Sequence, residues 1–283
     1  MTVATLSGPA DVDGFREAAR RLLAHGEAPE TVHWAVAGEA PSLWEDHGEP
    51  APTAFAGHRP TEPFKVPAGF VALCETTLLH RDPQRFALMY RLLWRLRHEP
   101  GFWCDELDPE RRRAEQLARE VRRDIHKMRA FVRFTPVAEP EGERHVAWFE
   151  PAFHIVEANA AFFMRRFAQM RWAILTPARS VAWDGERLSF GPGAHRRDAP
   201  APDAGAALWL TYYEHIFNPA RLKLDAMVKE MPRRYRVNLP EAALIAPHTA
   251  AATARREAMV AAEATTPRRT KPIATPRRVN PAA

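Results

Sequence analysis

The spacing of apolar residues along the chain changes from a helical period to an alternating one near residue 130. Apolar positions three and four apart predict helices over 12–25, 66–80, 82–98 and 109–130. Asp82 followed by Pro83 predicts the start of the third helix, because an aspartate cap and a proline in the first turn favour a helix N-terminus. The apolar stripe of the fourth helix is formed by Leu117, Val121, Ile125 and Met128.

After this change the pattern predicts strands, and then helices again. Alternation begins at Ala130, and the segment 145–151 is the expected partner strand. A helix over 155–168 follows, then a strand in RWAILTP at 171–177 and two strands around a turn at Asp184 and Gly185. The pattern therefore predicts an α+β fold in which a central antiparallel sheet is flanked by N-terminal and C-terminal helices. We expect one domain over 1–262, helical over 10–130, sheet-centred over 130–191 and helical over 203–262, with a disordered basic tail over 263–283.

Composition narrows the class of protein. Hydrophobic residues make up 46% and charged residues 27% of the chain, as in ordinary soluble proteins. No apolar run approaches the length of a membrane span, the N-terminus lacks a secretory pattern, and two cysteines form no framework, so we expect a cytoplasmic protein without a membrane partner. The net charge is +5, and five basic residues with no acid follow Glu263, so the basic excess lies in the tail.

Basic side chains also gather on helical faces that contain few acids within their own segments. On the 82–98 helix such an arc contains Arg91 and Arg95 and no acid, and it encloses Leu88 and Leu92, which indicates a face toward a partner. Arginines in this arrangement can bind the phosphates of nucleic acid. The candidate contacts are Arg91, Arg95, Arg119, Arg123, His126, Lys127, Arg129, Arg133, Arg221, Arg233 and Arg234. Tryptophans able to stack on a base are Trp148, Trp172 and Trp183.

Candidate catalytic chemistry is limited to one histidine. His126 can act as a general acid or base together with Glu150 or Asp184, although an exposed helical histidine gives the same sequence pattern. The chain contains no phosphate-binding GxxxxGK[ST] or GxGxxG loop, no HExxH motif and no GxSxG motif. We therefore expect no metal and no cofactor.

Several segments taken together resemble a known family. They include VRRDIHKMRAFVRF at 121–134 and IFNPARLKLDAMVKEMPRRYRVNLPEA at 216–242, and the resemblance covers about 10–262. The family is a domain of unknown function associated with DNA metabolism, found beside a radical-SAM protein and fused to UdgX-type uracil-DNA-binding glycosylase domains. The resemblance implies a DNA-associated protein of bacterial DNA metabolism or repair. Its implied partners are single-stranded or damaged DNA and a radical-SAM or uracil-DNA glycosylase-like protein.

Three hypotheses follow from these patterns. The first is a non-catalytic nucleic-acid-binding or accessory module for the processing of uracil or damaged bases. The second is a scaffold that docks a radical-SAM or glycosylase partner through the helix carrying Leu88 and Leu92. The third is a DNA-modifying enzyme that uses His126.

Overall fold

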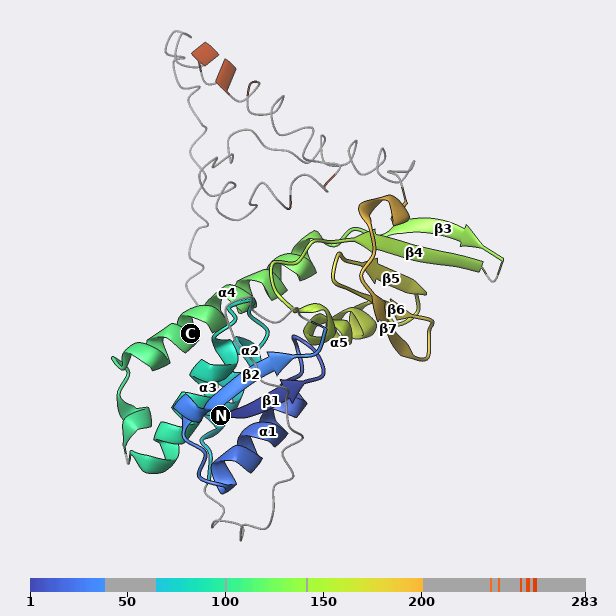
Figure 1. The fold of residues 1–283 in the computed structure, drawn as a ribbon. Coiled ribbons are helices and arrows are strands. Elements are labelled where there is room, and N and C mark those ends of the chain that lie inside the picture. The colour runs from blue at the N-terminus through green and yellow to red at the C-terminus, as the bar shows by residue number, and fades with distance from the viewer. Residues whose placement is uncertain are drawn as a thin grey trace, which may run out of the picture.

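The computed structural model describes residues 1–38, 65–99, 101–140 and 142–200, and the single residues Tyr235, Leu239, Ala250, Thr253, Ala254, Glu257 and Ala258. Within these residues the chain forms five α-helices and two β-sheets, which confirms the α+β class (Figure 1). The predicted C-terminal helices over 203–262 and the predicted tail over 263–283 lie outside the described residues, apart from those single positions. No described helix is long and apolar enough to cross a membrane.

The N-terminal segment forms a strand–helix–strand unit. β1 (Thr2–Leu6) and β2 (Val32–Val36) pair in parallel, and α1 (Val12–Ala24) connects them before a short 3-10 helix, η1 (Pro29–Thr31). Asp11 caps α1, because its Oδ1 accepts the backbone N–H of Gly14 at 2.8 Å. The helix predicted over 12–25 is confirmed. The segment over 10–130, predicted as helical, also contains the strand β2.

Three helices follow, and they confirm the predicted order. They are α2 (Ala68–Thr77), α3 (Arg85–His98) and α4 (Pro109–Phe131), with the 3-10 helix η2 (Phe102–Cys104) before α4. α3 begins later than predicted, because Asp82 and Pro83 lie in a preceding turn where Asp82 accepts the backbone N–H of Gln84 at 2.9 Å. Asp108 caps α4, because its side chain accepts the backbone N–H of Arg111 at 2.9 Å.

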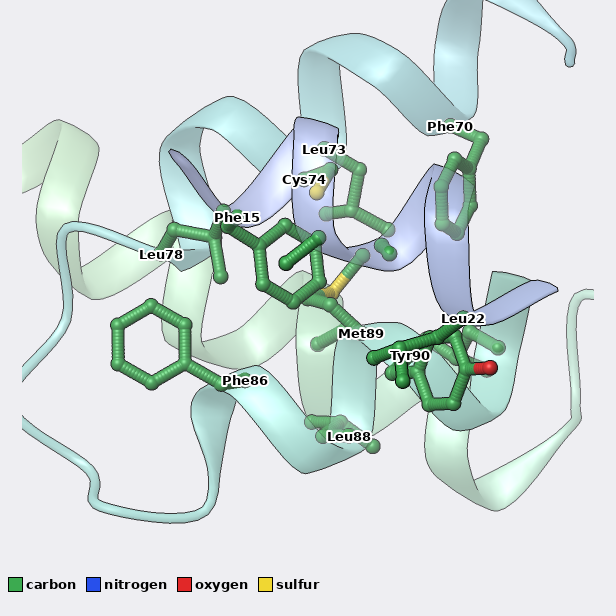
Figure 2. Packing of buried hydrophobic residues seen from close by; sticks show 14 of the residues in the cluster. Phe15, Leu22, Phe70, Leu73, Cys74, Leu78, Phe86, Leu88, Met89 and Tyr90 are labelled. Atoms are coloured by element: carbon green, nitrogen blue, oxygen red, sulfur yellow. The ribbon is translucent and has the colours of Figure 1, made fainter. Parts of the chain in front are cut away.

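The first hydrophobic core joins the N-terminal unit to α2 and α3. The ring of Phe15 from α1 lies 4.7 Å from Trp34 of β2 and 5.8 Å from Phe86 of α3, measured between centroids. Figure 2 shows Phe15 of α1 and Phe86 of α3 among the buried side chains of this core. Leu88 is 5% exposed and Leu92 is 0% exposed in this core. The predicted docking face on this helix is therefore corrected, because its two leucines are packed inside the protein.

The second sheet has five strands in chain order. They are β3 (Thr135–Glu139), β4 (Gly142–Trp148), β5 (Trp172–Leu175), β6 (Arg179–Trp183) and β7 (Leu188–Pro192). Three of the pairs are antiparallel, but β4 and β5 are parallel because α5 (Val156–Arg166) connects them as a crossover. The sheet is therefore mixed, which corrects the prediction of an antiparallel one. The strand pattern was predicted to begin at Ala130, which is too early, because α4 extends to Phe131 and β3 starts at Thr135.

α4 contributes side chains to both cores. Ala114, Leu117 and Ala118 pack in the first core, whereas Val121 and Met128 pack in the second, which lies between α4, α5 and the mixed sheet. In Figure 1, α4 runs from the N-terminal helices to the sheet. Its 23 residues make a helix about 34 Å long. One continuous helix thus packs against both hydrophobic cores of the described structure.

Candidate nucleic-acid interface

The outer side of α4 carries a straight row of basic side chains. Arg112, Arg119, Arg123 and His126 are all exposed, and we name these four residues the α4 stripe. At 100° per residue they fall within an arc of about 60°, and their Cα atoms span about 21 Å along the axis. The stripe therefore presents its side chains in one direction, opposite the face that packs into the cores.

The acidic residues of α4 are engaged by other side chains or by the backbone. Glu110 accepts from Arg91 Nε at 2.6 Å, and Glu115 accepts from Arg111 Nε at 3.0 Å. Glu120 contacts His80 Nε2 at 3.3 Å and Gln116 Nε2 at 3.2 Å. None of these three carboxylates is paired with a residue of the α4 stripe.

The fourth acid of α4 is inside the protein. Asp124 is 2% exposed, and its Oδ2 accepts the backbone N–H groups of Ala152 and Phe153 at 2.7 and 3.0 Å. Its Oδ1 accepts the hydroxyl of Tyr235. This carboxylate therefore fixes the loop before α5 and does not neutralise the outer face of the helix.

The arginines of the outer face have no such partners. Among the described residues, none makes a hydrogen bond or ion pair with the guanidinium group of Arg112, Arg119, Arg122 or Arg123. Arg122 lies beside the stripe and is also exposed. These four guanidinium groups keep their full charge toward solvent, which is the arrangement that a polyanion requires.

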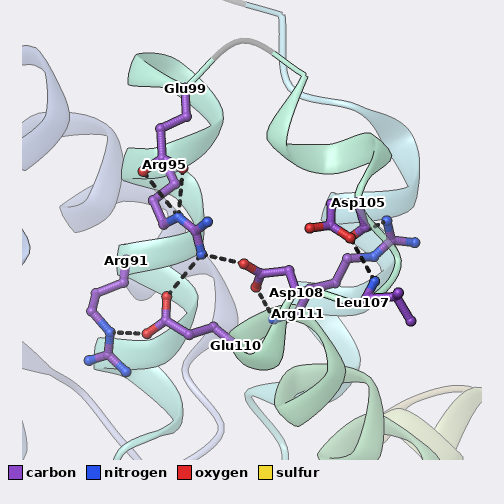
Figure 3. A network of polar contacts seen from close by, with 8 residues as sticks. All are labelled: Arg91, Arg95, Glu99, Asp105, Leu107, Asp108, Glu110 and Arg111. Carbon is purple, nitrogen blue, oxygen red and sulfur yellow. Dashed lines mark hydrogen bonds and ion pairs between the residues drawn. The ribbon is translucent and has the colours of Figure 1, made fainter.

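Arg91 and Arg95 of α3 are placed differently, in the network that Figure 3 shows. Arg95 Nη1 donates to Asp108 at 2.8 Å, its Nε contacts Glu99 at 3.0 Å, and its guanidinium lies 4.0 Å from the ring of Phe102. Burial disfavours the charge of Asp108, but the Arg111 backbone N–H and Arg95 outweigh it and hold the pKa of that carboxyl below its ordinary value. The expectation of an acid-free arginine face on α3 is corrected, because the acids come from α4 and from the residues that precede it.

The remaining predicted contacts lie in several environments. Lys127 is buried, with Nζ 5.8 Å from the ring of Phe131. Arg129 is exposed, whereas Arg133 is half-buried and donates to the carbonyl of Ala130 at 2.8 Å. Arg221, Arg233 and Arg234 lie outside the described residues. The structure therefore unites Arg119, Arg123, His126 and Arg129 on one surface, and adds Arg112 and Arg122, which the list of candidate contacts omitted.

The imidazole of His126 is exposed, and among the residues that the structure describes none makes a hydrogen bond or ion pair with it. Glu150 accepts from Trp148 Nε1 at 2.8 Å, and Asp184 accepts the backbone N–H groups of its own turn. The geometry gives His126 a position beside arginines, and it supplies no orienting carboxylate of the kind that a general base uses.

The three candidate tryptophans differ in exposure. Trp172 is 0% exposed in the second core, so it cannot stack on a base without unfolding, which corrects that expectation. Trp183 and Trp148 are half-buried, and Trp183 Nε1 donates to the carbonyl of Ala168 at 3.1 Å. Sequence reasoning did not assign the structural role of Tyr235, which stacks 5.8 Å from Phe131 and 5.5 Å from Phe149.

A cavity of about 420 Å³ lies at the carboxyl ends of β1 and β2. His154 lines it, and burial together with the charges of Arg85, Arg81 and His80 lowers the pKa of this imidazole to about 4. The ring is therefore neutral near pH 7. The described residues contain no group of three histidine, cysteine or acidic side chains that could hold a metal ion, and both Cys74 and Cys104 are free thiols.

Comparison with known proteins identifies one similarity. Residues 83–241 match the sequence profile of DUF4130, which is described as a domain of unknown function. No curated protein and no solved structure matches the chain. The matched segment includes α4, the mixed sheet and Tyr235, and it begins after the strand–helix–strand unit. Because the match covers more than half of the 283 residues, the chain belongs to the DUF4130 family.

Proposed function

We propose that this protein binds DNA through the outer face of α4 and acts as a non-catalytic module of DNA metabolism. The observation that carries the proposal is the separation of charge on α4. Its unpaired arginines form one exposed surface, and its four acids are engaged elsewhere. An exposed row of unpaired guanidinium groups is attracted to phosphates and gains affinity by releasing counterions.

The resemblance described above supports a more specific role. Relatives of this kind stand beside a radical-SAM protein or are fused to UdgX-type uracil-DNA-binding domains. We therefore propose that the module presents single-stranded or damaged DNA to such a partner. The enzyme hypothesis has less support, because His126 lacks an orienting partner among the described residues.

Binding of labelled DNA tests this proposal. The triple variant R112Q/R119Q/R123Q removes three charges from the α4 stripe, and we expect the slope of log K against log salt to fall by about two for single-stranded DNA. The affinity at moderate salt should fall about tenfold to a hundredfold. Fluorescence anisotropy across a salt series, with single-stranded, double-stranded and uracil-containing oligonucleotides, measures both quantities.

The matched control removes the same charge from another surface. The variant R187Q/R196Q/R197Q changes three exposed arginines of the β6–β7 turn and of the 3-10 helix η3 (Arg196–Asp198). It should retain nearly all of the affinity. Equal losses in the two triple variants, or no binding by the unaltered protein at low salt, would contradict the proposal.

A further inference from the structure

Arg129 is an exposed arginine whose orientation is fixed by two neighbours on α5. Its Nε donates to Oδ1 of Asn159 at 2.8 Å, and its guanidinium carbon lies 4.7 Å from the centre of the Phe162 ring. No other hydrogen bond or ion pair connects the guanidinium group of Arg129 to a described residue. Both terminal nitrogens therefore remain available, on a side chain that is already held in one place.

The acceptor on α5 is itself rigid. Asn159 is 0% exposed, and its Nδ2 donates to the carbonyl of Ile155 at 3.2 Å. Because the Nδ2 group is directed at a carbonyl, the amide oxygen of Asn159 is the atom that faces Arg129. The orientation of the guanidinium thus depends on a buried residue and not on another mobile surface chain.

The acceptor is also neutral, and this distinguishes Arg129 from the ion-paired arginines. Arg91, Arg111 and Arg179 donate from Nε to the carboxylates of other side chains. Those contacts offset the positive charge, whereas an amide acceptor leaves it intact. Arg129 therefore combines a fixed orientation with an uncompensated charge.

Two further groups lie on the same side of α4. Arg122 and His126 precede Arg129 by seven and three residues, so they occupy neighbouring turns on nearly the same face. Both are exposed and neither is paired with a described residue. An anion held by the terminal nitrogens of Arg129 would lie next to a second guanidinium and an imidazole.

We propose that Arg129 is a preorganised phosphate-binding residue and that Asn159 and Phe162 are its positioning residues. The ligand is a phosphodiester of the nucleic acid, so this inference rests on the proposed function. A planar guanidinium with two free terminal nitrogens matches the oxygens of a phosphate in a bidentate arrangement. The arginines of the α4 stripe have no such positioning contacts with the described residues, so they contribute charge without fixed geometry.

The comparison of two lysine variants tests this role. Arg129→Lys keeps the charge but loses the fork and the Nε–H that Asn159 holds, and Arg119→Lys makes the same chemical change at a position that is not held. We expect about tenfold weaker DNA binding for R129K and less than about twofold for R119K. The salt dependence should be unchanged in both variants, because the number of charges is the same.

Variants of Phe162 test the positioning role without altering any charge. Phe162→Leu removes the ring beneath Arg129 and should weaken DNA binding several-fold with an unchanged salt slope. Phe162→Tyr retains the ring and should restore the affinity. Thermal unfolding curves recorded alongside separate this effect from a loss of stability, and equal binding by the Leu and Tyr variants would contradict the role of the ring.

The possible outcomes distinguish this inference from the proposed function. If the unaltered protein binds no DNA, both are overturned. If it binds DNA and R129K loses no more affinity than R119K, only the role of Arg129 is overturned. Inorganic phosphate, added at constant ionic strength, should not displace the DNA, and displacement would assign the site to free phosphate instead.

Discussion

An arginine is available to a partner only if the folded chain brings no acid to it. Arg91 and Arg119 look alike in the sequence, since each lies on a basic helical face. In the structure Arg91 meets Glu110, which is 19 residues away, whereas Arg119 meets no acid among the described residues. Periodicity along one helix predicts which residues share a face, but it does not predict which other helix packs there. The basic surface of α4 was therefore predictable, and the neutralised one on α3 was not.

His154 makes a prediction at this scale. Its pKa is about 4 in the folded protein and 6.5 ordinarily, so the unfolded chain takes up a proton first as the pH falls from 6.5 toward 4. The contribution of His154 to the free energy of unfolding is thus fully present above pH 6.5 and is lost as the pH falls from 6.5 to 4. The full shift corresponds to about 3 kcal/mol, and partial exposure of the ring reduces the expected loss to about 1 kcal/mol between about pH 7 and pH 5.

Urea unfolding at the two pH values measures this effect. The variant His154→Gln removes the titrating group, so its free energy of unfolding should fall by about 1 kcal/mol less than that of the unaltered protein over the same change. Equal pH dependence in the two proteins would show that His154 is not held neutral by the fold.

At the scale of elements, the sequence of α4 predicted where the helix lies but not all of its tertiary contacts. Its bounds and its apolar stripe were predicted almost correctly, because a long helical period is a local signal. The predicted stripe, however, gave no sign that Asp124 would be buried among the apolar residues. Its partners come from the loop before α5 and from Tyr235, which is 111 residues away. Such contacts depend on tertiary packing.

The contact between α4 and Tyr235 can be measured through stability. Tyr235→Phe keeps the ring stacked between Phe131 and Phe149 but removes the hydroxyl that Asp124 accepts. Because a buried carboxylate then lacks one donor, we expect the free energy of unfolding to fall by about 1–3 kcal/mol. The double change with Asp124→Asn should cost less than the sum of the two single changes. Additive losses in chemical denaturation would argue against a direct contact.

At the scale of the whole molecule, the class of fold was predictable and the direction of one strand was not. Short apolar segments identify β4 and β5 as strands, but such segments suit parallel and antiparallel partners alike. The crossover through α5 decides the matter, and it depends on how that helix packs against β6 and α4. The two short parallel strands β1 and β2 were not predicted, because each has only five residues and the strongest local pattern in this region is the helical period of α1 between them.

Because α4 packs in both cores, we expect the two cores to unfold together as one cooperative unit. Leu117→Ala removes a side chain that is 2% exposed in the first core, and such truncations cost about 2–5 kcal/mol. Hydrogen exchange followed by mass spectrometry should show lost protection in β2 and also in β5, although β5 belongs to the second core. Arg112→Ala, on the outer face of the same helix, should leave both strands protected. A loss confined to β2 would show that the halves unfold separately.

The position of α4 has a further consequence for how a bound partner would act on the protein. A ligand that binds only the folded state adds stability by mass action, about 2.7 kcal/mol when its free concentration is a hundred times its Kd. A partner bound to the outer face of α4 therefore also opposes unfolding of the inner face of this helix, which packs in both cores. Occupancy of one surface would therefore slow proteolysis of the N-terminal unit and of the mixed sheet together, and the lifetime of the protein in a cell would rise with the amount of partner present.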